Sequence, residues 1–213
     1  MRAPVRLFLA SSNPGKLAEY RVLAQTVKPT LTGQAAIELK LLPGFESLPA
    51  FEENAPTFAE NAAGKALHHS RFCDGLVFAD DSGLVVPALG GAPGVLSARY
   101  AGPGASSAER NAKLVRELHG RSGRDRAAYF VCAIALAHGG RARAVVTARV
   151  DGQILEEPRG NRGFGYDPVF YVSALRKGFA EISAEEKNEY SHRGKAFRKL
   201  LAFLSHDSAT CQS

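Results

Sequence analysis

Acidic side chains stand where they could bind a metal ion or act as a general base. Asp80 and Asp81 directly follow a predicted buried strand over residues 76–79. The carboxyl ends of strands are the usual location of active sites in α/β sheets. Neighbouring strand residues point to opposite faces, so we expect one carboxylate to reach a cleft and the other to orient loop backbone. Taken alone, the segment fits a pair of turn or helix-cap aspartates equally well.

A second acidic segment, with Glu53 at its centre, lies just before a predicted helix. Thr57, Asn61 and Lys65 recur every four residues along that helix, so they lie near one polar face, opposite a face rich in alanine. A polar helix face of this kind is by itself more often only solvated.

The segment Ser11, Ser12, Asn13, Pro14, Gly15 and Lys16 has the composition of a phosphate-binding turn. It joins a predicted strand to a predicted helix, where free backbone N–H groups and the helix dipole attract anions, and Lys16 adds a full positive charge. It is not a Walker P-loop, which needs glycine where Ala10 stands and serine or threonine where Leu17 stands. An ordinary capped helix with a solvated lysine is the alternative.

A glycine-rich loop could receive a flat ligand such as a nucleotide base. It contains Phe164, Gly165, Tyr166 and Asp167, and glycines let a backbone approach a ligand while an aromatic ring offers a face for stacking. Lys187, His192 and Arg193 supply hydrogen-bond donors near a predicted helix start. The alternative is a mobile basic loop whose aromatic rings pack into the core. We expect the other histidines, His68, His69, His119, His138 and His206, to be exposed because no two have convincing ligand spacing.

The elements that must position these residues alternate between strand and helix. Strands are predicted over 5–10, 76–79 and 169–172, and a hairpin over 129–137 and 142–150, which makes the sheet mixed. Helices are predicted from Asn13 to Val27, over about 58–72 and about 107–119, and again after capping signals at Ser183 and Ser191. We therefore expect one bilobed domain over 1–205, with 206–213 as a frayed tail.

Composition places the chain among folded proteins that attract anions. It has 213 residues, 45% of them hydrophobic, with 27 Lys plus Arg against 21 Asp plus Glu, a net charge of +6. The apolar stretch near the start is too short for a signal peptide, and no later segment resembles a membrane span. The three cysteines, Cys73, Cys132 and Cys211, share no metal-ligand spacing and are odd in number, so we expect a reducing, cytoplasmic setting.

Taken in order, the motifs resemble the inosine triphosphate pyrophosphatase family over nearly the whole chain. The matching blocks are Ser11-Ser12-Asn13-Pro14-Gly15-Lys16, Thr57-Phe58-Ala59-Glu60-Asn61-Ala62, Ala79-Asp80-Asp81-Ser82-Gly83-Leu84, Gly90-Gly91-Ala92-Pro93-Gly94 with Ser97-Ala98-Arg99-Tyr100, Gly163-Phe164-Gly165-Tyr166-Asp167-Pro168, and Glu186-Lys187 with Ser191-His192-Arg193-Gly194. Departures are small: Val131 stands where a histidine is common, and Pro87 where an acidic residue is common. The segment 121–126 matches no part of the pattern, and we expect it to be a surface loop.

The resemblance implies an α/β fold with a long curved mixed sheet, flanking helices, and a nucleotide cleft between two lobes, usually in a homodimer. It implies Mg²⁺-dependent cleavage of ITP, dITP and XTP to the monophosphate and pyrophosphate, which cleanses the nucleotide pool. Glu53 and Asp81 match the metal ligands, and Asp81 also matches the proton acceptor. Residues 11–16 and Lys65 match the triphosphate site, and Ser82 also matches a substrate contact. Residues 164–167 match the base site, as do Lys187, His192 and Arg193.

Two other readings remain open. A Maf-type nucleotide pyrophosphatase would have a similar fold, but its opening motif should be an arginine-rich Ser-x-Ser pattern, which residues 12–16 lack. A nucleic-acid-binding protein could use the net positive charge and the loop with Phe164 and Tyr166. Glu53 and Asp81 would repel phosphates unless a metal were present, which disfavours this reading. We expect no stable nucleic-acid or membrane partner.

Overall fold

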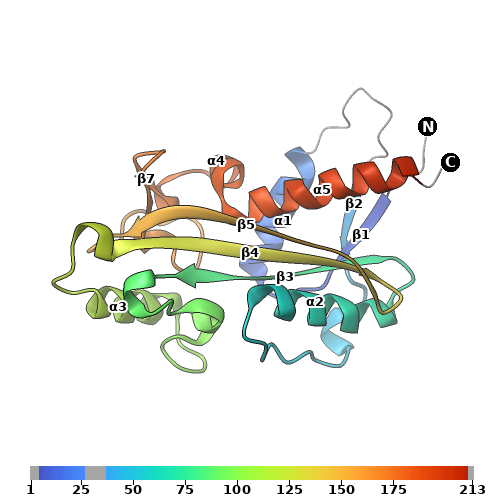
Figure 1. Cartoon of the computed structure of the whole chain (residues 1–213), viewed down its shortest axis with the longest axis horizontal. Coiled ribbons are helices and arrows are strands. Elements are labelled where there is room, and N and C mark those ends of the chain that lie inside the picture. The colour runs from blue at the N-terminus through green and yellow to red at the C-terminus, as the bar shows by residue number, and fades with distance from the viewer. Residues whose placement is uncertain (1–4, 27–36, 211–213) are drawn as a thin grey trace.

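A computed structural model of the chain describes residues 5–26 and 37–210. Within them the chain forms one elongated, seven-stranded sheet (Figure 1). The strands are β1 (Val5–Leu9), β2 (Ile37–Leu41), β3 (Leu76–Val85), β4 (Ala127–His138), β5 (Arg141–Ile154), β6 (Phe170–Val172) and β7 (Lys177–Gly178). Their order is β2-β1-β3-β4-β5-β6-β7, with β1 parallel to both neighbours and the other pairs antiparallel. The expected mixed α/β sheet and the hairpin of β4 and β5 are confirmed.

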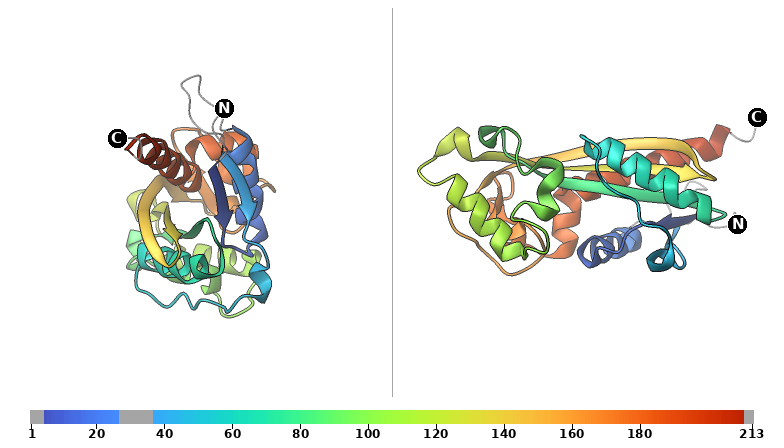
Figure 2. Two further views of the ribbon diagram at one scale, coloured as in Figure 1. Left: turned by 90° about the vertical axis from the view of Figure 1, so that its right-hand side faces the viewer. Right: turned by 90° about the horizontal axis from the view of Figure 1, so that it is seen from below.

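Helices cover both faces of this sheet. They are α1 (Pro14–Thr26), α2 (Phe58–His69), α3 (Ser107–Glu117), α4 (Ala184–Tyr190) and α5 (His192–Thr210). α2 packs on β3 and β4 from one side, and α5 packs on β4 and β5 from the other (Figures 1 and 2). The predicted helix starts are confirmed, because Asn13, Thr57, Ser106 and Ser183 each accept a hydrogen bond from a backbone N–H in the first turn.

The hydrophobic packing is divided between the two ends of the long strands. Tyr20, Phe78 and Phe197 pack edge-on or tilted between the sheet, α1 and α5, with ring centroids 5.2–5.9 Å apart. A separate cluster holds Phe130 and Phe170, whose ring centroids lie 4.6 Å apart. A third cluster, which includes Ala62 and Ala66, packs α2 against β3 and β4.

β3 is longer than the sequence predicts, which changes the place of Asp80 and Asp81. Both carboxylates lie within the strand and not at its end, because β4 provides an antiparallel partner for every residue from Val77 to Val85. Aspartate is depleted in strands, so the pattern of residue types predicted an end at Ala79. The expectation that the pair follows the strand was therefore wrong.

The end of the chain carries more helix than expected. α5 continues to Thr210, so part of the segment 206–213 that was expected to fray is helical. Adding a residue to an existing helix costs far less free energy than starting one, which allows α5 to outlast its apolar pattern. Val27 and Cys211 lie outside the described residues. No helix within 5–26 or 37–210 is long and apolar enough to cross a membrane.

Arg126 makes the segment 121–126 more than a surface loop. Its side chain is buried, and its guanidinium donates to the carbonyl oxygens of Leu118 at 3.0 Å, Ile154 at 2.6 Å and Leu155 at 2.6 Å. It thereby joins the end of α3 to the end of β5. The expectation of a plain surface loop holds for exposed Arg124 but is wrong for Arg126.

Replacing Arg126 should destabilise the protein. Arg126→Met keeps an apolar stem but leaves buried carbonyl groups without donors, so the free energy of unfolding should fall by about 2–4 kcal/mol. Chemical denaturation followed by circular dichroism measures this. Arg124→Met is the control and should change stability by less than about 0.5 kcal/mol. Equal effects of the two substitutions would show that the buried hydrogen bonds of Arg126 do not contribute.

His69 is buried, contrary to the expectation of exposure. Its side chain lies under Phe45, with ring centroids 4.8 Å apart, because the segment after β2 folds over α2. Its Nδ1 has no hydrogen-bond partner among the described residues. Burial, followed by the nearby His68 and Lys65, lowers the pKa of His69 to about 4. His69 is therefore neutral at physiological pH.

This shift predicts loss of stability in acid. The unfolded state takes up a proton on His69 near its usual pKa of about 6.5, whereas the folded state resists protonation until about pH 4, so stability should fall across this window as pH decreases. In His69→Asn, the midpoint of thermal unfolding should fall less between about pH 7 and about pH 5 than in the unchanged protein. His119→Asn, at an exposed site, is the control. Parallel pH profiles for His69→Asn and the unchanged protein would contradict the assignment.

Candidate active site

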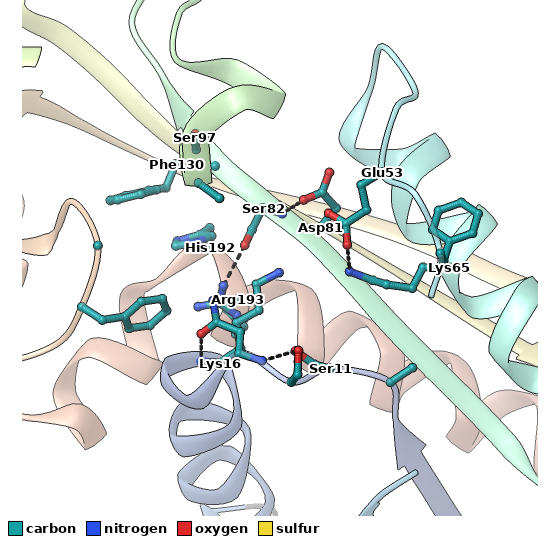
Figure 3. A pocket seen from close by; sticks show the side chains of 18 of the residues that line it. Ser11, Lys16, Glu53, Lys65, Asp81, Ser82, Ser97, Phe130, His192 and Arg193 are labelled. Carbon is teal, nitrogen blue, oxygen red and sulfur yellow. Dashed lines mark hydrogen bonds and ion pairs between the residues drawn. The ribbon is translucent and has the colours of Figure 1, made fainter. Parts of the chain in front are cut away.

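A cavity of about 600 Å³ lies along the middle of the sheet, a volume within the range of ligand sites in proteins. Of the residues singled out in the sequence, it is lined by Ser11, Ser12, Asn13, Lys16, Glu53, Lys65, Asp81, Ser82, Phe164, Gly165, Tyr166, Asp167, Lys187, His192 and Arg193. Figure 3 shows Glu53, Asp81 and Lys65 on one side of it and Lys16, His192 and Arg193 on the other. Segments far apart in the chain thus share one cavity.

The turn from β1 into α1 places polar groups at one wall of the cavity. Asn13 Oδ1 accepts from the backbone N–H of Lys16 at 3.1 Å, and Ser11 Oγ accepts from the backbone N–H of Asn13 at 3.3 Å. Lys16 Nζ lies 3.1 Å from Asp80 Oδ2 and donates to the Asp80 carbonyl oxygen at 3.2 Å. The first turn of α1 contains no acidic side chain, so the helix dipole and Lys16 together favour an anion here.

Pro14 and Gly15 belong to this turn but do not line the cavity. Pro14 is the first residue of α1, where its missing N–H costs nothing. Gly15 supports the wall indirectly, because a Cβ at that position would lie 2.6 Å from Cγ of Phe164. Glycine therefore lets the Phe164 ring pack directly on the start of α1.

Asp81 reaches the cavity from β3 and is largely buried. Its Oδ2 accepts from Asn61 Nδ2 at 3.0 Å, and its Oδ1 accepts from the backbone N–H of Ser82 at 2.8 Å. Burial raises the pKa of Asp81, Lys16 opposes this, and the neighbouring Glu53 carboxylate adds to the increase. Asp81 is thus a carboxylate of fixed orientation, and a cation beside it would stabilise its charged form.

The polar face of α2 is buried and not solvated as such faces usually are. Asn61 and Lys65 are 1% and 8% exposed, and Lys65 Nζ forms an ion pair with Glu53 Oε1. Thr57, four residues before Asn61, is the exposed helix cap. The segment that carries Glu53 covers this face, which no helical periodicity could indicate.

Glu53 and Asp81 fit the needs of a Mg²⁺ ion that also binds substrate. Mg²⁺ in such sites takes one or two carboxylates and completes its shell with phosphate oxygens and water. Both carboxylates line the cavity, and the charge of Glu53 disfavours ionisation of Asp81, a repulsion that a divalent cation would relieve. Among the described residues, no group of three or more His, Cys, Asp or Glu side chains forms a cage for a metal ion.

At the opposite end, buried charges surround the Phe164 ring. Lys187 Nζ contacts Glu19 Oε1 at 2.5 Å and also pairs with Asp167 Oδ2, and it lies 5.0 Å from the centre of the Phe164 ring. Asp167 Oδ2 accepts from the backbone N–H of Phe164 at 2.8 Å, which fixes the loop. Arg193 Cζ lies 5.6 Å from the same ring centre. An aromatic face among fixed donors is a suitable place for a nucleotide base.

Two further side chains shape this end. His192 stacks on Phe130 with ring centroids 4.7 Å apart and an interplanar angle of 8°. Burial, followed by the charges of Arg193 and Lys187, lowers the pKa of His192 well below its usual value, so its ring is neutral. Tyr166 is buried and donates to the carbonyl oxygen of Ser97 at 2.9 Å, so its ring belongs to the wall.

Sequence reasoning missed Glu19 and misjudged Asp80. Glu19 pairs with both Lys187 and Arg193 from the buried face of α1, and its position beside Tyr20 and four residues before Leu23 was the available signal. Asp80 is fully buried and does not line the cavity, which agrees with the expectation that only one carboxylate of the pair reaches it. Asp80 does not orient a loop, however, because its carboxylate pairs with side chains of α1 and α5.

Known proteins match nearly the whole chain in sequence. Residues 7–203 match the model of the Ham1 family. The chain is 49% identical over 194 residues to a dITP/XTP pyrophosphatase of Geobacillus kaustophilus, covering 91% of each protein. It is 48% identical over 199 residues to a dITP/XTP pyrophosphatase of Gloeobacter violaceus, covering 93% of this chain and 94% of the other.

A solved structure agrees in fold as well as sequence. The structure of a HAM1 protein from Coxiella burnetii superposes with a TM-score of 0.81 at 41% identity, covering 95% of this chain and 99% of that one. The resemblance found in the sequence motifs is confirmed, together with the fold that it implied. By its sequence, its sheet and the arrangement of its helices, this chain belongs to the Ham1 family.

Proposed function

We propose that this chain hydrolyses the non-standard purine nucleoside triphosphates ITP, dITP and XTP to the monophosphate and pyrophosphate. One observation carries the proposal: a single cavity holds two carboxylates, Glu53 and Asp81, beside two lysines, Lys16 and Lys65, with an aromatic loop and fixed donors at its other end. Relatives at 49% and 48% identity are named dITP/XTP pyrophosphatase. Such an activity would remove these nucleotides before they enter DNA or RNA.

The triphosphate is held at the start of α1 and by α2. Residues 11–16 present polar groups and the positive end of a helix dipole, and Lys16 and Lys65 offset the negative charge of the phosphates. Lys65 exchanges its contact with Glu53 for a phosphate oxygen, and Ser82 contacts the substrate from β3. These assignments are supported by the lining of the cavity and by the lack of an acidic side chain in the first turn of α1.

Asp81 acts as the proton acceptor, and with Glu53 it holds the metal ion. When bound there, Mg²⁺ supplies positive charge beside the phosphate oxygens and increases the acidity of water. Asp81 takes the proton as the water oxygen forms a bond to the α-phosphorus, and the bond from that phosphorus to the bridging oxygen breaks, releasing pyrophosphate. The hydrogen bonds from Asn61 and Ser82 keep the carboxylate of Asp81 oriented throughout.

The base stacks on Phe164 and is chosen by hydrogen-bond donors. Arginine has five N–H donors and lysine three, and the partners of Arg193 and Lys187 among the described residues leave some of these unused. The first backbone N–H groups of α5, at His192 and Arg193, have no acceptor within the helix. Donors of this kind favour an oxo group at position 6 of the purine and disfavour the amino group of adenine.

The family resemblance also suggests the domain extent, the oligomeric state and the cellular location of the protein. We propose that residues 1–205 work as one bilobed domain, that two copies form a homodimer in the cytoplasm, and that neither nucleic acid nor membrane is a stable partner. The cavity is lined by residues from Ala10 to Arg193, which supports the whole domain as the unit of function.

A panel of nucleoside triphosphates tests the activity. With Mg²⁺ present, ITP, dITP and XTP should release pyrophosphate and not inorganic phosphate, and ATP should be cleaved with kcat/KM at least about tenfold lower because its amino group leaves buried donors unpaired. Arg193→Gln should reduce the ratio of kcat/KM for ITP over ATP. Each ratio is measured on one enzyme preparation, so a partly unfolded variant does not distort it.

Other outcomes of the panel would reject the proposal. Equal cleavage of ATP and ITP by the unchanged enzyme would exclude a donor-matched base site. Cleavage restricted to modified pyrimidine or guanine nucleotides would favour the Maf-type activity. Salt-dependent binding of nucleic acid with no turnover of any nucleotide would favour a nucleic-acid-binding protein.

Asp81→Asn tests the proton acceptor and metal ligand. The substitution keeps the shape and one hydrogen-bond acceptor but removes the charge and the basic oxygen, so kcat for ITP should fall on the order of 10³-fold or more. Asp74→Asn, at an exposed acidic residue that contacts His138, is the matched control and should leave kcat unchanged. EDTA should abolish the activity of the unchanged enzyme, and added Mg²⁺ should restore it. Full activity of Asp81→Asn or in EDTA would refute the assignment.

A further inference from the structure

Asp80 is the one fully buried carboxylate that contacts a side chain from each end of the cavity among the described residues. It lies in the middle of β3 with 0% exposure. Its Oδ2 is 3.1 Å from Lys16 Nζ and 3.4 Å from Arg193 Nε, while its Oδ1 has no partner among the described residues. A single oxygen atom is therefore shared by a cation of α1 and a cation of α5.

The two cations have different tasks in the proposed function. Lys16 lies at the start of α1, where the phosphates bind, and Arg193 lies beside Phe164, where the base binds. Arg193 is held by several partners at once, because Nη1 pairs with Glu19 and Nη2 donates to Ser82 Oγ at 2.7 Å. Lys16 contacts only the carboxylate and the carbonyl oxygen of Asp80 through its ammonium group, among the described residues.

Lys16 donates to the carboxylate and the carbonyl oxygen of Asp80 and has one ammonium N–H left, so a phosphate that binds Lys16 competes with Asp80 for its charge and weakens their contact. Weakening the contact between a buried carboxylate and its cation costs free energy. This cost offsets part of the attraction between Lys16 and phosphate. The cost is smaller when a second cation stays on the same oxygen, and Arg193 is that cation. The strength of phosphate binding therefore depends on a residue at the base end of the cavity.

We propose that Asp80 is a positioning residue that competes with the substrate phosphates for Lys16, and that Arg193 weakens this competition by sharing Asp80 Oδ2. This inference rests on the proposed function, which puts phosphates at Lys16. It assigns Asp80 a role in limiting how tightly the product pyrophosphate is held, and it links the phosphate site to the base site without any movement of the backbone.

Pyrophosphate is the right probe because it has no base. Its dissociation constant can be measured by isothermal titration calorimetry with Mg²⁺ and requires no turnover. Asp80→Asn has nearly the same shape but no charge, so Lys16 is released and pyrophosphate should bind about tenfold more tightly. Glu38→Gln removes a charge from an exposed ion pair on β2 and is the control, with no change expected.

Arg193→Gln gives an independent and opposite test. Without Arg193, Lys16 is the one cation left on Asp80 among the described residues, so pyrophosphate should bind several-fold more weakly although it never reaches the base site. Lys187→Gln removes the same charge from the same end of the cavity, but Lys187 pairs with Glu19 and Asp167 and not with Asp80. The weakening should be clearly greater for Arg193→Gln than for Lys187→Gln.

The outcomes separate the inference from its alternatives. Tighter binding in Asp80→Asn that disappears in the Lys16→Met background would support competition for Lys16. Weaker or unchanged binding in a folded Asp80→Asn variant would overturn it, since a merely structural role cannot tighten binding. If Asp80→Asn does not fold, equal effects of Arg193→Gln and Lys187→Gln overturn the inference by themselves. Turnover of ITP by the unchanged enzyme is measured alongside, and its absence would instead reject the proposed function.

Discussion

Side chains of neighbouring residues in a β-strand point to opposite faces, and the whole site is built around this constraint at Asp80 and Asp81. Asp80 faces α1 and α5, where it meets Lys16 and Arg193, whereas Asp81 reaches the cavity and meets Asn61 of α2. Both residues lie at the centre of β3, where their backbone partners on β4 are Ile134 for Asp80 and Ala133 for Asp81. One position of the strand thus supplies an internal counter-ion and the next supplies a carboxylate that lines the cavity.

The charges of the site are nearly all paired before any substrate arrives. Lys16 pairs with Asp80, Lys65 with Glu53, and Lys187 with Glu19 and Asp167. Buried ions need such partners because the loss of hydration costs several kcal/mol for each isolated charge. These pairs hold the cations in place, and each pair gives its cation a partner with which any anionic ligand would have to compete. Burial also opposes ionisation of Asp80, yet the charges of Lys16 and Arg193 lower its pKa to about 2.

The positions of the helix N-termini determine which polar groups reach the cavity. α1 and α5 both begin at the cavity, so their unpaired N–H groups and dipoles favour anions and oxo groups there. α2 begins outside the cavity and delivers Asn61 and Lys65 along its length instead. Gly15 and Gly163 let the Phe164 loop pack against α1 and Asp167, since a Cβ at either glycine would overlap a neighbouring side chain. The loop that carries Phe164 therefore packs directly against the turn from β1 into α1.

Local patterns determined much of this protein from the sequence alone. Strands β1 and β6, the hairpin of β4 and β5, the helix caps and the polar character of the cavity-lining segments depend on contacts within a few residues, which a sequence displays directly. β2 and β7 were not predicted. The matching motifs also led to the family. Contacts between distant segments were decided by tertiary structure. Glu19 meets Lys187 across 168 residues, β3 runs past Ala79 because β4 pairs with it, and His69 and Lys65 are buried because a separate segment covers α2. Such contacts depend on how the elements pack in three dimensions. The residue types within one segment do not show which distant segment will pack against it.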